Sequence, residues 1–413
     1  MVRTPQPRRR QARSLANDAR ILDAVVTLLD SKGWEETSIT GIAAQAGLTH
    51  PAVLDRYSNR AAAVVAAWDE RIAADFRRAL SALISVVDTQ PVDADSLLDV
   101  LDYFVYPTPA TRAAAEVLLV ARYDTTLAEA VDRSVGSDLQ EWLTPTRGRL
   151  TRAQAARRGF VIGLAIGTLI ESRLRIPEDD FDLTQDVRHI AAALSTRELP
   201  TKLPSERAEH LFEPPRFDLQ DPALEDLLAA TLEEVGEFGF EAATVKRIAS
   251  RAGYTTGLIF RRYDHKLSLF LDATQRMLAQ SGVANQEYQV RIAAATSPGV
   301  ADATMTREFM RPEHRQLRTI AYEQYRIAWH DPVMQGTFAA AQDEILAYYV
   351  SAAPELSLEQ ARGRTFLAFA RGAGMGALAD LSSSAADLPY DVVSVPLVEL
   401  SGGSGVLAQD IPD

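Results

Sequence analysis

Apolar residues recur at helical spacing along nearly the whole chain. Leu22, Val26 and Leu29 lie at i, i+4 and i+7, and the same spacing returns at Leu228 and Leu232. This period places each set on one face of a helix. No run of alternating apolar and polar residues is long enough to indicate a sheet. The pattern therefore predicts an all-α fold.

The sequence also matches itself at a shift of 206 residues. The matched pairs include Leu22 and Leu228, Gly33 and Gly239, Ile42-Ala43 and Ile248-Ala249, Gly47 and Gly253, Arg56-Tyr57 and Arg262-Tyr263, Gln154-Ala155 and Gln360-Ala361, Arg158 and Arg364, and Phe160 and Phe366. Because the register is kept from the first helices to the last, we interpret the chain as a tandem duplication.

Two stretches interrupt the helical period. Prolines are concentrated among charged residues between Leu199 and Pro222, a composition that favours an extended linker. From Ser382 to Asp413 the period is lost, which is typical of a loose tail.

A short motif near the start of each half predicts a compact arrangement of three helices. Gly33 can end the first helix in a left-handed conformation, and Thr37 or Ser38 can cap the second. Gly47 permits a tight turn, and Thr49 can cap a third helix. The outer face of such a third helix is free to enter a DNA major groove, so the motif predicts a helix-turn-helix.

The order of residues in this motif resembles the signature of the TetR family. That order is a helix, Gly-aromatic, a Thr/Ser-rich cap, Ile-Ala, Ala-Gly, Thr, and an aromatic residue beside a basic one. Residues 253–266 resemble it more closely than the first copy does. The resemblance implies two TetR-like units, each a three-helix DNA-binding domain followed by a helical ligand-binding and dimerisation domain. It also implies a ligand-responsive transcriptional repressor.

These interpretations define the expected domains. They are a basic tail (1–14), a first helix-turn-helix domain (15–60), a first regulatory domain (61–198), a linker (199–222), a second helix-turn-helix domain (223–267), a second regulatory domain (268–381) and a flexible tail (382–413). We call the two helix-turn-helix segments the first and second modules.

The resemblance also assigns DNA contacts in both modules. Residues at phosphate-contacting positions are Thr37, Ser38, Arg56 and Arg60, and Thr244, Lys246, Arg262 and Lys266. Residues at base-reading positions are His50, Ala52 and Asp55, and Thr256, Leu258 and Arg261, with Thr49 and Thr255 at the start of each recognition helix. Arg261 is the best candidate, since an arginine can bind guanine bidentately.

Several residues depart from the family pattern. Pro51 removes an amide that could bind phosphate, and Asp55 puts a negative charge on the face that should meet DNA. The first helix of the second module is acidic, with no basic residue from Asp221 to Glu241. The alternative of a small-molecule sensor or protein-interaction module with one or both DNA-binding units degenerate therefore stays open.

Aromatic residues in the two regulatory regions are candidates for an effector pocket. The candidates are Tyr103, Tyr123 and Trp142 in the first half and Tyr322, Tyr325 and Trp329 in the second, with Tyr348 and Tyr349 also available. Aromatics at helical spacing also serve as core, so both roles stay open, and the effector is an unknown small molecule. Glycines within 159–167 and 372–376 predict close approach of two helices.

Composition narrows the classes of function. The net charge of −13 argues against indiscriminate binding to nucleic acid, but basic clusters at 3–13 and 246–266 leave room for local contact. There is no cysteine, no glycine-rich phosphate loop and no recognisable nucleophile–base pair. We therefore expect no enzyme, no cofactor and no metal site.

The longest apolar run, residues 159–170, falls short of the ~20 residues that span a bilayer, so we expect a cytoplasmic protein without membrane contact. The two halves are expected to pack as an intrachain pseudo-dimer, with recognition helices about 34 Å apart on double-stranded DNA. Unequal readers predict an asymmetric operator. Whether two chains form a further homodimer stays open.

Overall fold

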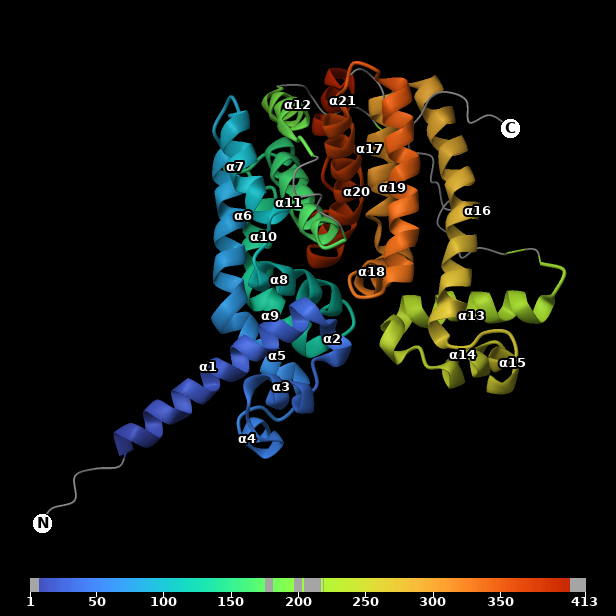
Figure 1. Ribbon diagram of the computed structural model, residues 1–413. Coiled ribbons are helices and arrows are strands. Elements are labelled where there is room, and N and C mark those ends of the chain that lie inside the picture. The colour runs from blue at the N-terminus through green and yellow to red at the C-terminus, as the bar shows by residue number, and fades with distance from the viewer. Residues whose placement is uncertain (1–6, 175–180, 197–202, 204–216, 218, 402–413) are drawn as a thin grey trace, which may run out of the picture. The chain divides into compact units, whose positions relative to one another are not determined.

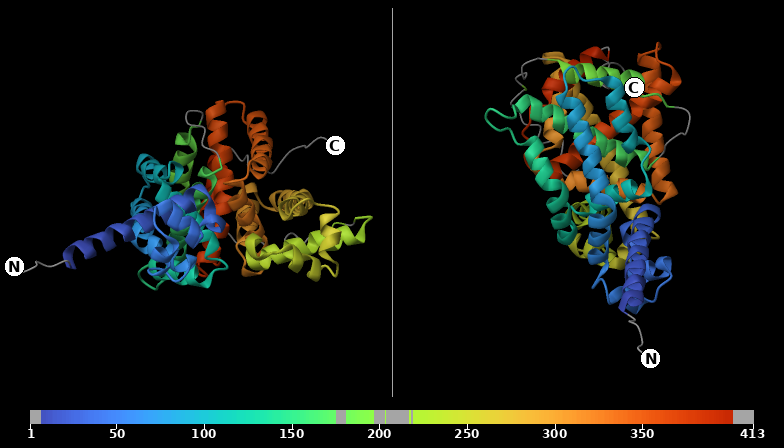
Figure 2. Two further views of the ribbon diagram at one scale, coloured as in Figure 1. Left: turned by 60° about the horizontal axis from the view of Figure 1, so that its bottom comes forward. Right: turned by 90° about the vertical axis from the view of Figure 1, so that its left-hand side faces the viewer.

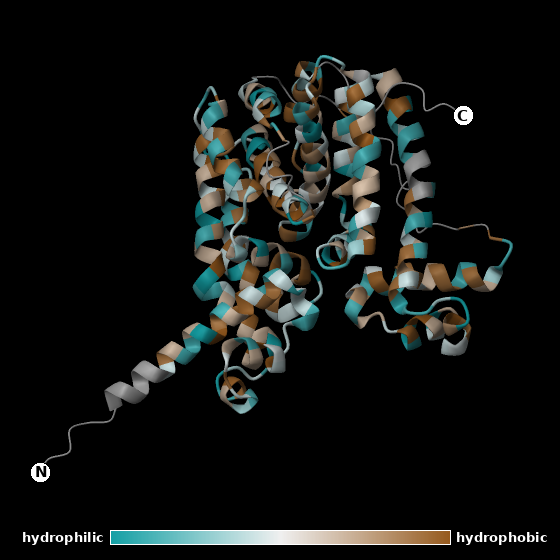
Figure 3. Ribbon diagram, viewed as in Figure 1, coloured by the Kyte–Doolittle hydropathy of each residue, from teal (hydrophilic) through white to brown (hydrophobic). Residues whose placement is uncertain are grey.

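The computed structural model describes residues 7–174, 181–196, 203, 217 and 219–401. Within these ranges every regular element is a helix, and the only β-type pairing is an isolated bridge between Thr146 and Leu150 (Figures 1 and 2). The prediction of an all-α fold is confirmed. Apolar and polar residues form bands along the helices, as expected for amphipathic segments (Figure 3).

The described residues belong to two compact units. Unit 1 comprises Met1–Ser81 and Tyr106–Asp138, and unit 2 comprises Ala82–Val105 and Leu139–Asp413. The helices of unit 1 are α1 (Pro7–Ser31), α2 (Gly33–Glu36), α3 (Ile39–Ala46), α4 (His50–Leu54), α5 (Arg60–Ala67), η1 (Trp68–Ile72), α8 (Pro109–Val120), α9 (Thr125–Val131) and η2 (Asp132–Gly136). Two helices, α6 (Ala73–Asp88) and α10 (Ser137–Leu143), cross the division between the units.

Unit 2 holds the second module and the longest of the described helices, α16. Its helices are α7 (Ala94–Val105), α11 (Arg152–Ser172), α12 (Thr184–Ser195), α13 (Pro222–Ala242), α14 (Val245–Arg251), α15 (Thr256–Phe260), α16 (Lys266–Ala295), α17 (Pro298–Phe309), η4 (Pro312–His314), α18 (Arg315–Ala328), α19 (Pro332–Ala352), α20 (Leu358–Leu381) and α21 (Asp391–Leu400).

The most extensive packing within unit 2 joins α11 to α20, and α12 packs against α21. Glycines make the first contact possible. A Cβ built on Gly167 would lie 1.6 Å from the carbonyl oxygen of Ala370, and one on Gly374 would lie 1.7 Å from that of Gly163. The predicted close approach of these two glycine-containing helices is confirmed.

The predicted tails are wrong where the structure describes them. Helix α1 begins at Pro7, within the expected tail 1–14, because the residues that follow are good helix formers. The expected flexible tail at 382–413 contains helix α21, in which Val393 is fully buried. Packing of this apolar helix against α17 and α12 outweighs the proline inside it, Pro396. Residues 1–6 and 402–413 lie outside the described residues.

Most of the predicted linker, 199–222, also lies outside the described residues, and Pro222 already belongs to α13. Among the described residues, no helix is both long enough and apolar enough to cross a lipid bilayer.

Candidate nucleic-acid interface

The first module has the turn that its sequence predicts. Ser38 caps α3 by accepting a hydrogen bond from the amide of Gly41 at 3.0 Å. Gly47 ends α3 with φ of 62°, in the left-handed region that favours glycine. Thr49 then caps α4 by accepting from the amide of Ala52 at 3.4 Å.

The second module has the same local geometry. Thr244 caps α14 by accepting from the amide of Arg247 at 3.3 Å. Gly253 has φ of 77° and precedes α15, whose Ile259 is fully buried. Thr255 is the N-cap residue of α15, although its side chain makes no capping bond. Helices α14 and α15 therefore meet through a tight turn.

The predicted base readers lie on α4 and α15 or at the C-caps of these helices. His50, Asp55 and Arg261 are exposed, whereas Thr256 and Leu258 are half-buried, as is Ala52. Sequence reasoning missed Phe260, which is 58% exposed at the end of α15. An aromatic side chain can contact a thymine methyl group in the major groove. Phe260 could have been identified from the sequence because it lies between Ile259, an expected core position, and Arg261, the best candidate base reader.

The predicted phosphate contacts are not equally available. Thr37 is 0% exposed, and its hydroxyl donates to the carbonyl oxygen of Gly33 at 2.7 Å. Its side chain is used inside the module and does not reach the surface. Ser38, Thr244 and Lys246 are exposed, and their contact with a phosphate backbone stays a prediction.

Arg60 and Lys266 occupy matching places in the two modules. Each donates to the carbonyl oxygen of the aromatic residue after the first glycine, Trp34 for Arg60 and Phe240 for Lys266. Each also lies 4.0 Å from the centroid of that aromatic ring. Both cations therefore stabilise the break after the first helix of their module, besides any contact with DNA.

The two arginines that follow the recognition helices form ion pairs. Arg56 pairs with Asp18 and donates to the carbonyl oxygen of Ala52 at 2.9 Å. Arg262 pairs with Asp221 at 2.7 Å. These contacts hold each arginine against the first helix of its own module.

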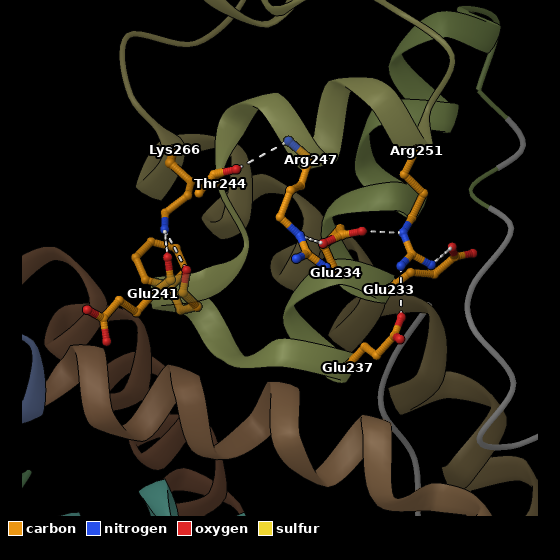
Figure 4. Close-up of polar contacts among 9 residues, drawn as sticks. Glu233, Glu234, Glu237, Glu241, Thr244, Arg247, Arg251 and Lys266 are labelled. Carbon is orange, nitrogen blue, oxygen red and sulfur yellow. Dashed lines mark hydrogen bonds and ion pairs between the residues drawn. The ribbon is translucent and has the colours of Figure 1, made fainter. Parts of the chain in front are cut away.

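The acidic face of α13 binds arginines of α14 (Figure 4). Glu234 accepts from Arg247 at 2.7 Å and from Arg251 at 2.6 Å, and Arg251 also contacts Glu233 and Glu237. Burial opposes ionisation of Glu234, but the two arginines lower its pKa below the ordinary value. The hydrogen bond with Glu234 raises the pKa of Arg251.

This network leaves two cations of the second module for other partners. Among the residues that the structure describes, Lys246 and Arg261 make no ion pair or hydrogen bond, and both side chains are exposed. The acidic helix that the sequence suggested would repel phosphate has its charges partly compensated, at the expense of Arg247 and Arg251.

The predicted pocket aromatics lie in both units, with Tyr123 in unit 1 and the other five in unit 2. In unit 2 the three residues of α18 and its end bond to other helices: Tyr322 donates to Ala373, Tyr325 to Glu171, and the Trp329 indole to Ile170 at 3.2 Å. Tyr103 and Trp142 are half-buried. None of the six borders the cavity of unit 2 that Phe160, Arg364 and Tyr349 line.

A family model matches the second module, and a short segment of the chain resembles curated proteins. Residues 227–273 match the family model described as bacterial regulatory proteins, tetR family. A segment of 62 residues is 40% identical to the HTH-type transcriptional regulator BetI of Escherichia coli O139:H28 (strain E24377A / ETEC). The same identity is found with BetI of Escherichia coli O9:H4 (strain HS) and of strain SMS-3-5.

The aligned segment is 15% of this chain and 31% of each relative, so the chain spans about a third of the length of the curated relatives it matches. The tetR family consists of transcriptional regulators and not enzymes, in agreement with the prediction of a non-enzymatic protein. The helices α13 to α16 contribute the matched residues. Residues 227–273 are therefore a helix-turn-helix DNA-binding domain of the tetR family.

Proposed function

We propose that the protein is a ligand-responsive transcriptional regulator that reads an asymmetric operator with two unequal modules. The observation that carries this proposal is the surface of the second module, a tetR-type domain that presents Arg261 and Lys246 without partners among the residues that the structure describes. Arg261 follows α15, the recognition helix, and would bind a guanine edge. Lys246 would contact phosphate, and Phe260 would pack on a base.

The first module is proposed to bind DNA more weakly. Its α4 presents His50, with Asp55 at the C-cap, and Pro51 supplies no amide. Ser38 at the N-cap of α3 and the basic cluster at 3–13, most of which lies in the first turns of α1, would then supply most of the phosphate contacts. A weak first module and a stronger second module would favour an operator with unlike half-sites.

We propose that the two modules arose by tandem duplication, because they share local geometry. In both modules a glycine with φ near 80° breaks the chain direction near the end of the first helix: Gly33, at 80°, follows α1, and Gly239, at 79°, lies at a kink inside α13. In both, the next amide donates to a buried glutamate: Trp34 to Glu116 at 2.8 Å, and Phe240 to Glu323 at 3.1 Å. The same bond at the same turn favours common ancestry for the two modules.

The intrachain pseudo-dimer is proposed from the packing of α11 and α12 with α20 and α21. In a duplicated chain these are the last two long helices of each half, so they would replace the interface between two subunits. A ligand that changes how these helices pack would change the spacing of the modules and release DNA. Repression with induction, in the cytoplasm, is the proposed outcome.

DNA binding to the sequence upstream of the protein's own gene tests the proposal. The full chain is titrated against this fragment and a scrambled one at several salt concentrations. We expect specific binding that weakens steeply with salt. Arg261→Ala should cost about 1–3 kcal/mol on the specific fragment only, whereas Lys246→Ala should weaken both fragments and reduce the salt slope by about one.

The alternative is a sensor or interaction module with degenerate DNA-binding units. The exposed Asp55 and the ion pairs that occupy Arg247 and Arg251 favour it. It predicts no salt-dependent binding to either fragment. If no such binding is found and circular dichroism shows that the proteins are folded, the sensor or interaction module would replace the regulator proposal.

A further inference from the structure

Unit 2 contains a cavity of about 250 Å³ among helices from both halves of the chain. Its wall is mostly apolar, with Phe160 and Leu164 from α11, Ile190 from α12, and Leu367 and Ala368 from α20. The volume lies just below the ~300–1,000 Å³ of pockets for drug-sized ligands. The cavity therefore suits a compact organic molecule.

Two buried polar side chains on this wall lack full sets of hydrogen bonds. Arg364 is 8% exposed and donates through Nε to Asp186 at 2.9 Å, but its two terminal nitrogens have no acceptor among the described residues. Tyr349 is 5% exposed, and its hydroxyl also lacks a partner within that part of the chain. The Arg364 guanidinium lies 5.8 Å from the Tyr349 ring centroid, so both face one region of the cavity.

The second arginine on the wall, Arg371, differs from Arg364 in the use of its terminal nitrogens. Both terminal nitrogens of Arg371 donate hydrogen bonds to Asp302, at 2.5 and 3.1 Å. Donors on the wall of a cavity that have no protein acceptor are satisfied by water or by a ligand. A carboxylate satisfies Arg364 best, since bonds between ionised partners are the strongest. Burial raises the pKa of Tyr349 to about 12, so its hydroxyl remains a donor at neutral pH.

The corresponding arginine of the first half is saturated. Arg158, at the same place in the 206-residue match, donates to Asp88 at 2.6 and 3.0 Å and to the carbonyl oxygen of Trp142 at 3.3 Å. It does not line the cavity. Of the two matched arginines, only Arg364 has terminal nitrogens without an acceptor among the described residues.

We propose that this cavity binds one compact apolar carboxylate per chain, with the carboxylate on the terminal nitrogens of Arg364 and the hydroxyl of Tyr349. As the effector site, it rests on the regulator function proposed above. The ligand would contact α11 and α12 on one side and α19 and α20 on the other. Its binding would therefore act on the helices that join the two halves.

Calorimetry of the full chain without DNA tests the site. The probes are benzoate and octanoate, each beside its uncharged amide. We expect one carboxylate per chain and at least about tenfold weaker binding of the amides. Arg364→Gln should abolish this preference, and Tyr349→Phe should weaken carboxylate binding severalfold. Arg158→Gln removes the matching arginine, which lies on α11 outside the cavity, and should leave carboxylate binding unchanged.

A second variant covers the case in which Arg364→Gln fails to fold. Ala368→Phe fills the cavity while keeping both Arg–Asp pairs, and it should abolish binding of both carboxylates. Equal affinity for acid and amide, no binding at millimolar concentration, two sites per chain, or unaltered binding in Ala368→Phe would each overturn the proposal.

DNA titration with and without the bound carboxylate separates the two proposals. Selective one-site binding by a protein that ignores its upstream DNA would retain the cavity as a ligand site and reject the regulator. Salt-dependent DNA binding by a protein that binds no carboxylate would retain the regulator and reject this site.

Discussion

Glu171 lies on α11 where this helix meets α18 and α19. Its carboxylate accepts from the hydroxyl of Tyr325 and from the amide of Gln342, the latter at 3.0 Å. Burial raises its pKa from 4.5 to about 8, although both hydrogen bonds favour the charged form. Glu171 is therefore largely protonated in the folded protein at neutral pH.

A pH-dependent stability follows from this shift. The folded state keeps a proton that the unfolded chain releases above about pH 5, so the free energy of unfolding falls as pH rises towards 8. The slope from this group is at most about 1.4 kcal/mol per pH unit. Glu171→Gln cannot ionise and should lose that part of the dependence.

Urea unfolding of the two proteins from pH 5 to 8 measures the effect. We expect the variant to gain stability relative to the parent as pH rises. The comparison cancels every other titrating group, which both proteins share. A difference that stays constant over this range would show that Glu171 is ionised throughout.

At the scale of elements, a buried glutamate fastens each module to a helix outside it. Glu116 of α8 accepts from the Trp34 amide within unit 1, and Glu323 of α18 accepts from the Phe240 amide within unit 2. Both glutamates are nearly inaccessible, at 1% and 2% exposure. A buried amide that loses its acceptor costs about 1–3 kcal/mol.

Replacing either glutamate should loosen one module and spare the other. In Glu323→Ala we expect faster hydrogen exchange of the amides of α13 to α15, with the amides of α1 to α4 unchanged. Glu116→Ala is the reciprocal control and should give the opposite pattern. Exchange that rises equally in both modules would indicate global destabilisation, and the local role would be rejected.

The contact between α11 and α20 leaves no room for a methyl group at its centre. A Cβ on Gly167 would lie 1.6 Å from a backbone oxygen of α20, a distance that requires the helices to separate. Gly372 lies on the same α20 with no atom within 4 Å of its Cβ position. Both glycines are in helices, but only Gly167 packs tightly against another helix, so Gly372 serves as its control.

Gly167→Ala should therefore lower the melting temperature by several degrees, through overpacking of about 1–3 kcal/mol. Gly372→Ala should be neutral or raise it slightly, because alanine favours a helix by up to about 1 kcal/mol. Thermal unfolding followed by circular dichroism gives both values. Equal effects of the two substitutions would contradict close packing at Gly167.

For the whole molecule, periodicity and caps were readable from the sequence because they are local. The turn at Gly47 and the cap at Ser38 follow from short-range rules, and the spacing of the glycines around Gly167 indicated a close approach of helices. The burial of Thr37 depends on which way one side chain turns and was not readable.

Long-range pairing was equally hidden. Helix α21 contains Pro396 and forms through contacts with α12 and α17, segments far away in sequence. The pocket aromatics could be named as a class, but the sequence does not indicate that Arg364 lines a cavity, with terminal nitrogens that have no acceptor among the described residues. Such a charge would ordinarily be assigned to the surface.

The last prediction concerns the oligomeric state of the chain. If α11, α12, α20 and α21 replace a subunit interface, their apolar faces are already covered within one chain and no second chain is needed. Light scattering on the free protein and on its complex with one operator fragment should then give one chain per particle. A stable dimer of chains as the only species that binds DNA would contradict the pseudo-dimer. Gly167→Ala sharpens the test, since parting α11 from α20 should weaken operator binding, which needs both modules at a fixed spacing, more than binding to scrambled DNA.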